Sequence, residues 1–139
     1  MTNRKLEYIV KDQRPLTLSA HETVQHACQC MRERNAGSVL VIDEQQRLRG
    51  IFTGRDAVRT LASGKPDADA PLARAMTADP VHMAPGSTAI HALRLMQDGG
   101  FRHVPICDQG RVVGIVSQGD FRGEEHARLD IETGIWERL

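Results

Sequence analysis

The sequence predicts a mixed α/β fold of two tandem repeats, each with the element order β-α-β-β-α, related by a pseudo-twofold axis. First, the chain contains two similar copies of one pattern. Thr23 and Asp56 of the first copy correspond to Thr88 and Asp120 of the second. Second, each copy has one apolar stripe at helical spacing, followed by two short apolar runs joined by a polar turn. A repeat of this length needs a neighbour to bury its apolar face. Two copies packed in this way should leave clefts between them, where small ligands bind.

Each copy is expected to begin with an extended segment and to continue into a helix capped by Thr23 or Thr88. The extended segments are residues 15–18 and 80–83. The apolar stripes of the two helices are Val24, Ala27, Cys28 and Met31, and Ala89, Ala92, Leu93 and Met96. Breaks at 35–37 and 99–100 end the helices. Strands are expected at 38–42, 48–52, 103–107 and 112–116, paired as two hairpins.

We divide the chain into a first repeat at 1–61, a linker at 62–71, a second repeat at 72–123 and a C-terminal tail at 124–139. The linker is rich in Gly, Pro, Asp and Ala. The segment after Asp120 is too polar for the apolar helix that the first copy has at that place. The tail carries the single tryptophan, Trp136, which predicts docking on its own domain or on a partner subunit.

Composition excludes several classes of function. Lys plus Arg and Asp plus Glu number 18 each, so a broad basic surface for nucleic acid is not expected. No apolar run has the length of a membrane span, and none follows the N-terminus as a signal peptide would. Three cysteines without framework spacing indicate reduced thiols and a cytoplasmic location.

The chemistry is concentrated in a motif that follows the second strand of each hairpin, at residues 53–56 and 117–120. One interpretation is a capping box, in which Thr53 or Ser117 caps a helix and the aspartate three residues later returns the bond. The other is a ligand site. The free amides of a helix start suit a phosphate, and a carboxylate can accept both hydroxyls of a ribose. The two interpretations are compatible.

With these motifs the chain resembles the CBS domain pair, the Bateman module, from about Leu6 to Phe121. The resemblance rests on residues 50–56, 114–120 and 101–108, and residues 75–81 look like the lead-in of the second repeat. It implies two CBS repeats with two ligand clefts. One cleft would use Thr77, Val81, Arg102, His103, Val104, Pro105, Ser117 and Asp120. The other would use Leu16, Gly37, Ser38, Val39, Leu40, Thr53 and Asp56.

The first copy departs from the family pattern. It has Leu40 where the second copy has Pro105, and Gly37 and Ser38 where the second has Arg102 and His103. Because an arginine and an imidazole suit phosphate, the second cleft is expected to bind phosphate better, unless Arg55 or a residue across the cleft substitutes in the first.

The expected function is a non-enzymatic sensor that binds AMP, ADP, ATP, NAD or a similar adenine nucleotide and requires no cofactor. The alternative is a structural dimerisation domain without a physiological nucleotide. No nucleophile is joined to a base and an acid, so no catalytic residue is expected. His26 and Cys30 share a helix face, but they do not complete a zinc set, so no metal is expected. The apolar helix stripes predict a homodimer.

Overall fold

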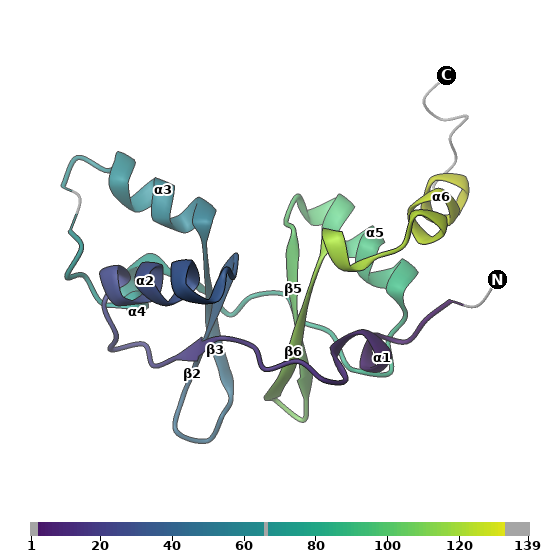
Figure 1. Cartoon of the computed structure of the whole chain (residues 1–139), viewed down its shortest axis with the longest axis horizontal. Coiled ribbons are helices and arrows are strands. Elements are labelled where there is room, and N and C mark those ends of the chain that lie inside the picture. Colours follow the sequence, from purple (N-terminus) through teal and green to yellow (C-terminus); the bar gives the residue numbers. More distant parts are fainter. Residues whose placement is uncertain (1–2, 66, 133–139) are drawn as a thin grey trace. The chain divides into compact units, whose positions relative to one another are not determined.

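The computed structural model describes residues 3–65 and 67–132, and the chain divides into two compact units. The first-repeat unit contains Arg14–Val81 and the turn Gln109–Val112. Among the described residues, the second-repeat unit contains 3–13, His82–Asp108 and 113–132. Figure 1 shows one hairpin with its helices in each unit.

The first-repeat unit is built on a four-stranded sheet with the order β1-β2-β3-β4. The strands are β1 (Thr17–Leu18), β2 (Ser38–Ile42), β3 (Leu48–Thr53) and β4 (Thr77–Ala78). Strands β2 and β3 form the expected antiparallel hairpin, and Ser38 lies opposite Thr53. Strand β1 joins β2 in parallel, and β4 joins β3 in antiparallel orientation. Strand β3, which leads into the polar motif, is therefore paired on both sides.

The helices of this unit that follow Thr23 and Thr53 begin where the sequence predicts, whereas the short helix at 72–75 lies where the sequence predicts none. The helices are α2 (Val24–Arg34), α3 (Gly54–Ala62) and α4 (Leu72–Ala75). The Thr23 hydroxyl accepts the His26 amide at 3.0 Å, which satisfies a free donor of the first turn of α2. Asn35 ends α2 in the left-handed conformation, at φ 50°. The core consists of Val24, Ala27, Val39, Val41, Phe52, Ala70 and Leu72.

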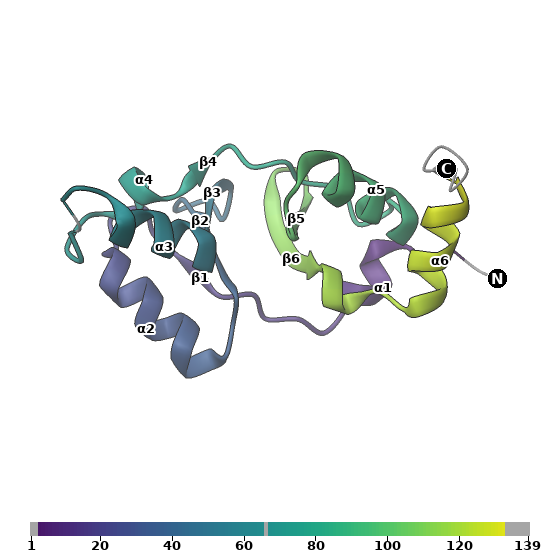
Figure 2. The same ribbon diagram turned by 90° about the horizontal axis from the view of Figure 1, so that it is seen from above.

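The second-repeat unit repeats this plan with a sheet of two strands instead of four. Its elements are α1 (Leu6–Val10), α5 (Ala89–Gly99), β5 (His103–Asp108), β6 (Arg111–Ser117), the 3-10 turn η1 (Gln118–Asp120) and α6 (Gly123–Glu132). Strands β5 and β6 form the second hairpin, and Met83 adds a parallel bridge to Ile106. Thr88 caps α5 through the His91 amide, and Gly100 ends the helix with a φ of 71°. Helices α5 and α6 lie side by side in both views (Figures 1 and 2).

Residues 3–13 pack in the unit of the second repeat, although the expected division at 1–61 places them in the first repeat. Leu6 and Val10 are buried in the second core, and the Leu6 amide donates to the Ser87 carbonyl at 2.8 Å. The segment fits because β6 carries a glycine at the contact. A Cβ on Gly114 would lie 2.5 Å from the Val10 Cβ. Gly50 receives the side chain of Met76 in the same way in the first-repeat unit.

The polar segment after Asp120 also differs from the expectation of a tail, because it forms helix α6. Glu125 is only 3% exposed, and its carboxylate pairs with Arg4. Phe121 is buried in the second core beside the start of this helix. A buried ion pair thus replaces the apolar contacts that the sequence lacks here. Trp136 lies outside the described residues.

The helix stripes are used inside their own units. Val24 and Ala27 are buried in the first core, with Cys28 and Met31 packed against it. Ala89, Ala92, Leu93 and Met96 are all buried in the second core. The stripes that predict a homodimer are therefore largely buried within their own units. Large exposed hydrophobic side chains on the described helices are Val58 and Leu61 on α3, which are 65% and 73% exposed, and Tyr8 on α1, which is 68% exposed. Within residues 3–65 and 67–132, no helix combines the length and hydropathy needed to cross a bilayer.

Candidate functional site

The first candidate cluster is built where β3 ends and α3 begins. The Asp56 carboxylate accepts the Thr53 amide at 2.9 Å, and the Asp56 amide donates back to the Thr53 hydroxyl at 3.4 Å. This is the expected capping box. It fixes both the hydroxyl and the carboxylate at the end of β3. Ser38 lies opposite Thr53 on β2 and is 8% exposed.

Asp56 is also bound by two side chains from outside the capping box. The Arg59 guanidinium lies 3.1 Å from Oδ1, and the Thr77 hydroxyl donates to the same oxygen at 3.4 Å. Asp56 is 4% exposed, so these bonds satisfy a buried charge. The carboxylate is well held in the free protein.

Thr77 therefore lies with the first motif, whereas the sequence analysis grouped it with Ser117 and Asp120. The cause is the sheet register, because β4 pairs with β3 and places Thr77 opposite Ile51. Val81 follows on the same segment and is 49% exposed. The segment that precedes the second repeat thus adds strand β4 to the sheet of the first-repeat unit.

The second candidate cluster has the same box at the end of β6. The Asp120 carboxylate accepts the Ser117 amide at 2.7 Å and the Ser117 hydroxyl at 3.2 Å, both through Oδ2. Asp120 is exposed. The box opens the three-residue turn η1 rather than an α-helix, so the expected row of free helix amides is not formed. Phosphate binding at this cluster would depend on side chains instead.

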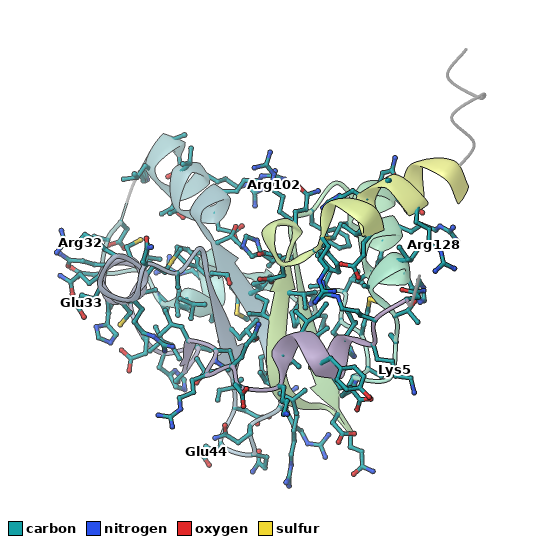
Figure 3. All side chains as sticks on the ribbon, turned by 45° about the vertical axis from the view of Figure 1, so that its right-hand side comes forward. Lys5, Arg32, Glu33, Glu44, Arg102 and Arg128 are labelled. Atoms are coloured by element: carbon teal, nitrogen blue, oxygen red, sulfur yellow. The ribbon has the colours of Figure 1, made fainter. Side chains whose placement is uncertain are left out.

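Arg102 and His103 are the residues that the sequence predicts for such a role. His103 is the first residue of β5, and the Arg102 carbonyl accepts the Gln118 amide at 3.3 Å. This bond ties the segment before β5 to the turn that carries Asp120. The Arg102 side chain is exposed on the surface of the unit (Figure 3).

Several expected ligand residues are part of the packed interior. Val39 and Val104 are fully buried in the two cores, and Leu40 and Pro105 are also buried. The Leu16 carbonyl accepts a hydrogen bond from the Leu40 amide at 2.9 Å. These strand residues can shape a site, but they offer it few free polar groups. Gly37 is exposed beside them, at the entry to β2.

Two ion pairs beside the candidate clusters were not predicted from the sequence. Arg59 lies three residues after Asp56 on a helix, and this spacing alone could have indicated the ion pair. Arg4 binds Glu125 with two bonds, of 3.0 Å and 2.6 Å, and also donates to the Asp120 carbonyl at 3.2 Å. No local pattern signals this contact, because Arg4 and Glu125 are 121 residues apart.

His26 and Cys30 lie close together on α2, but they do not form a metal site with their described neighbours. The Cys30 sulfur lies 3.6 Å from His26 Nε2, and a Glu22 oxygen lies 3.9 Å from the same nitrogen. Among the residues that the structure describes, no group of three or more His, Cys, Asp or Glu side chains is arranged to hold a metal ion. Cys28, Cys30 and Cys107 are free thiols. Burial raises the pKa of the Cys28 and Cys107 thiols, which lowers their reactivity.

A separate pocket of about 540 Å³ lies in the first-repeat unit. It is lined by residues 17–21, 42–45 and Arg49, and none of these is an expected ligand residue. Asp43 forms part of its wall and pairs with Arg49 at 2.9 Å. The Arg47 amide, together with the Gln45 amide and Arg49, holds the pKa of Asp43 below its usual range.

These features define a class of protein: tandem β-α-β-β-α repeats whose hairpins each end in a hydroxyl–carboxylate capping box. The family model of the CBS domain matches residues 8–63 and 72–126. The chain therefore belongs to the CBS domain family, which confirms both the resemblance and the predicted tandem-repeat fold.

Relatives and solved structures agree with this assignment. An uncharacterized 17.7 kDa protein of Acidianus ambivalens is 39% identical over 112 residues, which are 80% of this chain and 65% of that protein. This chain thus spans slightly less than two thirds of that relative. The CBS-domain protein ATU1752 of Agrobacterium tumefaciens has a TM-score of 0.77 and 29% identity, over 84% of this chain and 95% of that one.

A third match is a structure that contains a ligand. The CBS domain protein PAE2072 of Pyrobaculum aerophilum was solved in complex with AMP. It has a TM-score of 0.83 and 19% identity, and the match covers 92% of this chain and 99% of that one. At this identity the match shows a shared fold.

Proposed function

We propose that this chain is a non-catalytic sensor that binds an adenine nucleotide at the hydroxyl–carboxylate clusters of its two repeats. The observation that carries the proposal is the exposed Asp120 carboxylate. Ser117 fixes one of its oxygens, and no donor among the described residues occupies the other. A fixed carboxylate with a free oxygen is suited to accept the two hydroxyls of a ribose.

The groups around Asp120 fit the rest of a nucleotide. Arg102 and His103 stand on the segment tied to η1, and they offer donors for a phosphate. The AMP complex of the Pyrobaculum aerophilum protein supports the proposal to the extent that the same fold accommodates this ligand. Because the two proteins are only 19% identical, the assignment of ligand residues rests on the side chains of this chain.

The direct test is a thermal-shift panel of AMP, ADP, ATP, NAD and S-adenosylmethionine. A ligand that binds only the folded state, at a concentration of about 100 times its Kd, adds about 2.7 kcal/mol of stability. This corresponds to an increase in Tm of several degrees. The proposal predicts this shift for at least one adenine nucleotide and none for inorganic phosphate at the same concentration. A panel without any shift would contradict it.

A second property, self-association, is supported by the exposed face of α3. Val58 and Leu61 are three residues apart on this helix and are both largely exposed. Apolar side chains that cluster on a helix face favour contact with another protein surface. We infer that α3, rather than the stripes of α2 and α5, takes part in a homodimer. Sedimentation velocity with and without AMP tests whether the chain associates and whether the ligand changes the association.

A further inference from the structure

The two motif carboxylates differ in how many of their acceptor positions are filled. Oδ2 of Asp56 accepts the amide and the hydroxyl of Thr53, at 2.9 Å and 3.2 Å. Oδ1 accepts Arg59 at 3.1 Å and Thr77 at 3.4 Å. A carboxylate offers about four lone-pair sites. Asp56 therefore has no acceptor position left for a ribose.

Asp120 keeps half of its acceptor positions open. Ser117 occupies Oδ2 with two bonds, and among the described residues nothing donates to Oδ1. Arg4 reaches the main-chain carbonyl of Asp120 and not its carboxylate. The position that Arg59 has in the first repeat is Gly123 in the second, three residues after Asp120. The difference is therefore encoded in the sequence.

Arg59 occupies an acceptor position of Asp56 from which a ligand could displace it. It lies one helical turn after Asp56 on α3, and its side chain is 70% exposed, whereas that of Asp56 is 4% exposed. Ion pairs with an exposed partner are weak, because water and side-chain entropy offset the attraction. A ligand can therefore displace the arginine, but the ligand must first break this bond.

We propose that Arg59 is an internal competitor for the ribose at Asp56, so that the first repeat is the weaker nucleoside site of the two. The inference rests on the proposed function, because it assumes that the motif carboxylates receive a ribose. In the free protein, Arg59 occupies one of the acceptor positions of the Asp56 carboxylate. The second repeat has no such occupant, and Asp120 accepts a ribose directly. Arg59 thus sets the order in which the two repeats fill.

The experiment uses adenosine as the probe, because it carries no phosphate that could itself attract Arg59. Calorimetry on the Asp120→Asn variant isolates the first repeat, since the second has lost its charged acceptor. In this background Arg59→Gln should tighten adenosine binding about two- to fivefold, the range that an exposed ion pair allows. The matched control is Arg32→Gln, the same charge change at an exposed arginine of α2 (Figure 3), which should leave adenosine binding unchanged.

The outcomes separate this inference from the proposed function. If wild-type protein binds adenosine or AMP but Arg59→Gln leaves first-repeat affinity unchanged or weakens it, the competitor role is wrong and the sensor function stands. If Arg32→Gln tightens binding as much as Arg59→Gln does, the effect is one of net charge, and the inference is also wrong. If the wild-type protein binds neither ligand, the proposed function fails, and the inference fails with it.

Discussion

Replacing Arg4 by glutamine should destabilise the second-repeat unit measurably. Arg4 binds the Glu125 carboxylate through Nε at 3.0 Å and through Nη2 at 2.6 Å. The Glu125 side chain is 4% exposed, and that of Arg4 is 22% exposed. Without Arg4, the carboxylate retains its bond to the Arg122 amide, at 2.8 Å, and little else among the described residues.

The magnitude lies between two limits. Breaking a fully buried ion pair costs about 3–5 kcal/mol, whereas an exposed pair contributes about 1 kcal/mol or less. An orphaned Glu125 can also take up a proton. From an ordinary pKa near 4.5, protonation at neutral pH costs about 3 kcal/mol, which caps the penalty. Because Arg4 is partly exposed, we expect a loss of about 2 kcal/mol in the free energy of unfolding.

The loss should depend on pH. The hydrogen bond from Arg4, together with the Arg122 amide, lowers the pKa of Glu125 in the folded protein. A carboxyl group with a lowered pKa stabilises the fold fully above its unfolded value, near 4.5, and this contribution disappears as the pH falls through the folded value. The difference between wild type and Arg4→Gln should therefore be largest at neutral pH and should shrink below about pH 4.5.

Urea denaturation followed by circular dichroism at pH 7 and pH 3.5 measures this difference. Arg32→Gln is the control, because Arg32 is exposed and should change stability by about 0.5 kcal/mol or less. An Arg4→Gln variant within 0.5 kcal/mol of wild type at pH 7 would refute the role given to the pair. A difference that stayed constant down to pH 3.5 would refute the titration argument.

Two further predictions concern packing and assembly. Gly114→Ala should cost about 1–3 kcal/mol by urea denaturation, because its Cβ would lie 2.5 Å from the Val10 Cβ. Gly86→Ala has open space around the new Cβ and should not cost more than about 1 kcal/mol, so equal losses would contradict docking of the N-terminal segment. Leu61→Glu should weaken self-association in sedimentation velocity, since it places a charge on the exposed face of α3. An association constant unchanged by this substitution would remove α3 from the interface.

The repeat pattern predicted the fold well because its signals are local. Helix caps, hairpin turns and apolar spacing act over a few residues, and Thr23 and Thr88 cap their helices as expected. The capping boxes were likewise predicted in both motifs.

The sequence predicted less well wherever segments far apart in the chain come together. It did not indicate that residues 3–13 pack with the second repeat, because Gly114, the glycine that leaves room for them, looks like any strand glycine. It also suggested a polar tail after Asp120, since the partner that neutralises Glu125 lies at the opposite end of the chain. The bond between Thr77 and Asp56 was not predicted for the same reason, because strand order rather than chain order places Thr77 beside Asp56.

The most direct test of the sensor function is the affinity of AMP for wild-type protein and for Asp120→Asn, measured by calorimetry on folded samples. The substitution keeps the size of the side chain and removes the charge that the free oxygen offers to a ribose. Loss of a charge-assisted bond of about 1.5–3 kcal/mol predicts that AMP binds the variant at least about tenfold more weakly. An unchanged Kd, with the variant as stable as wild type, would reduce Asp120 to a capping residue and contradict the proposed site.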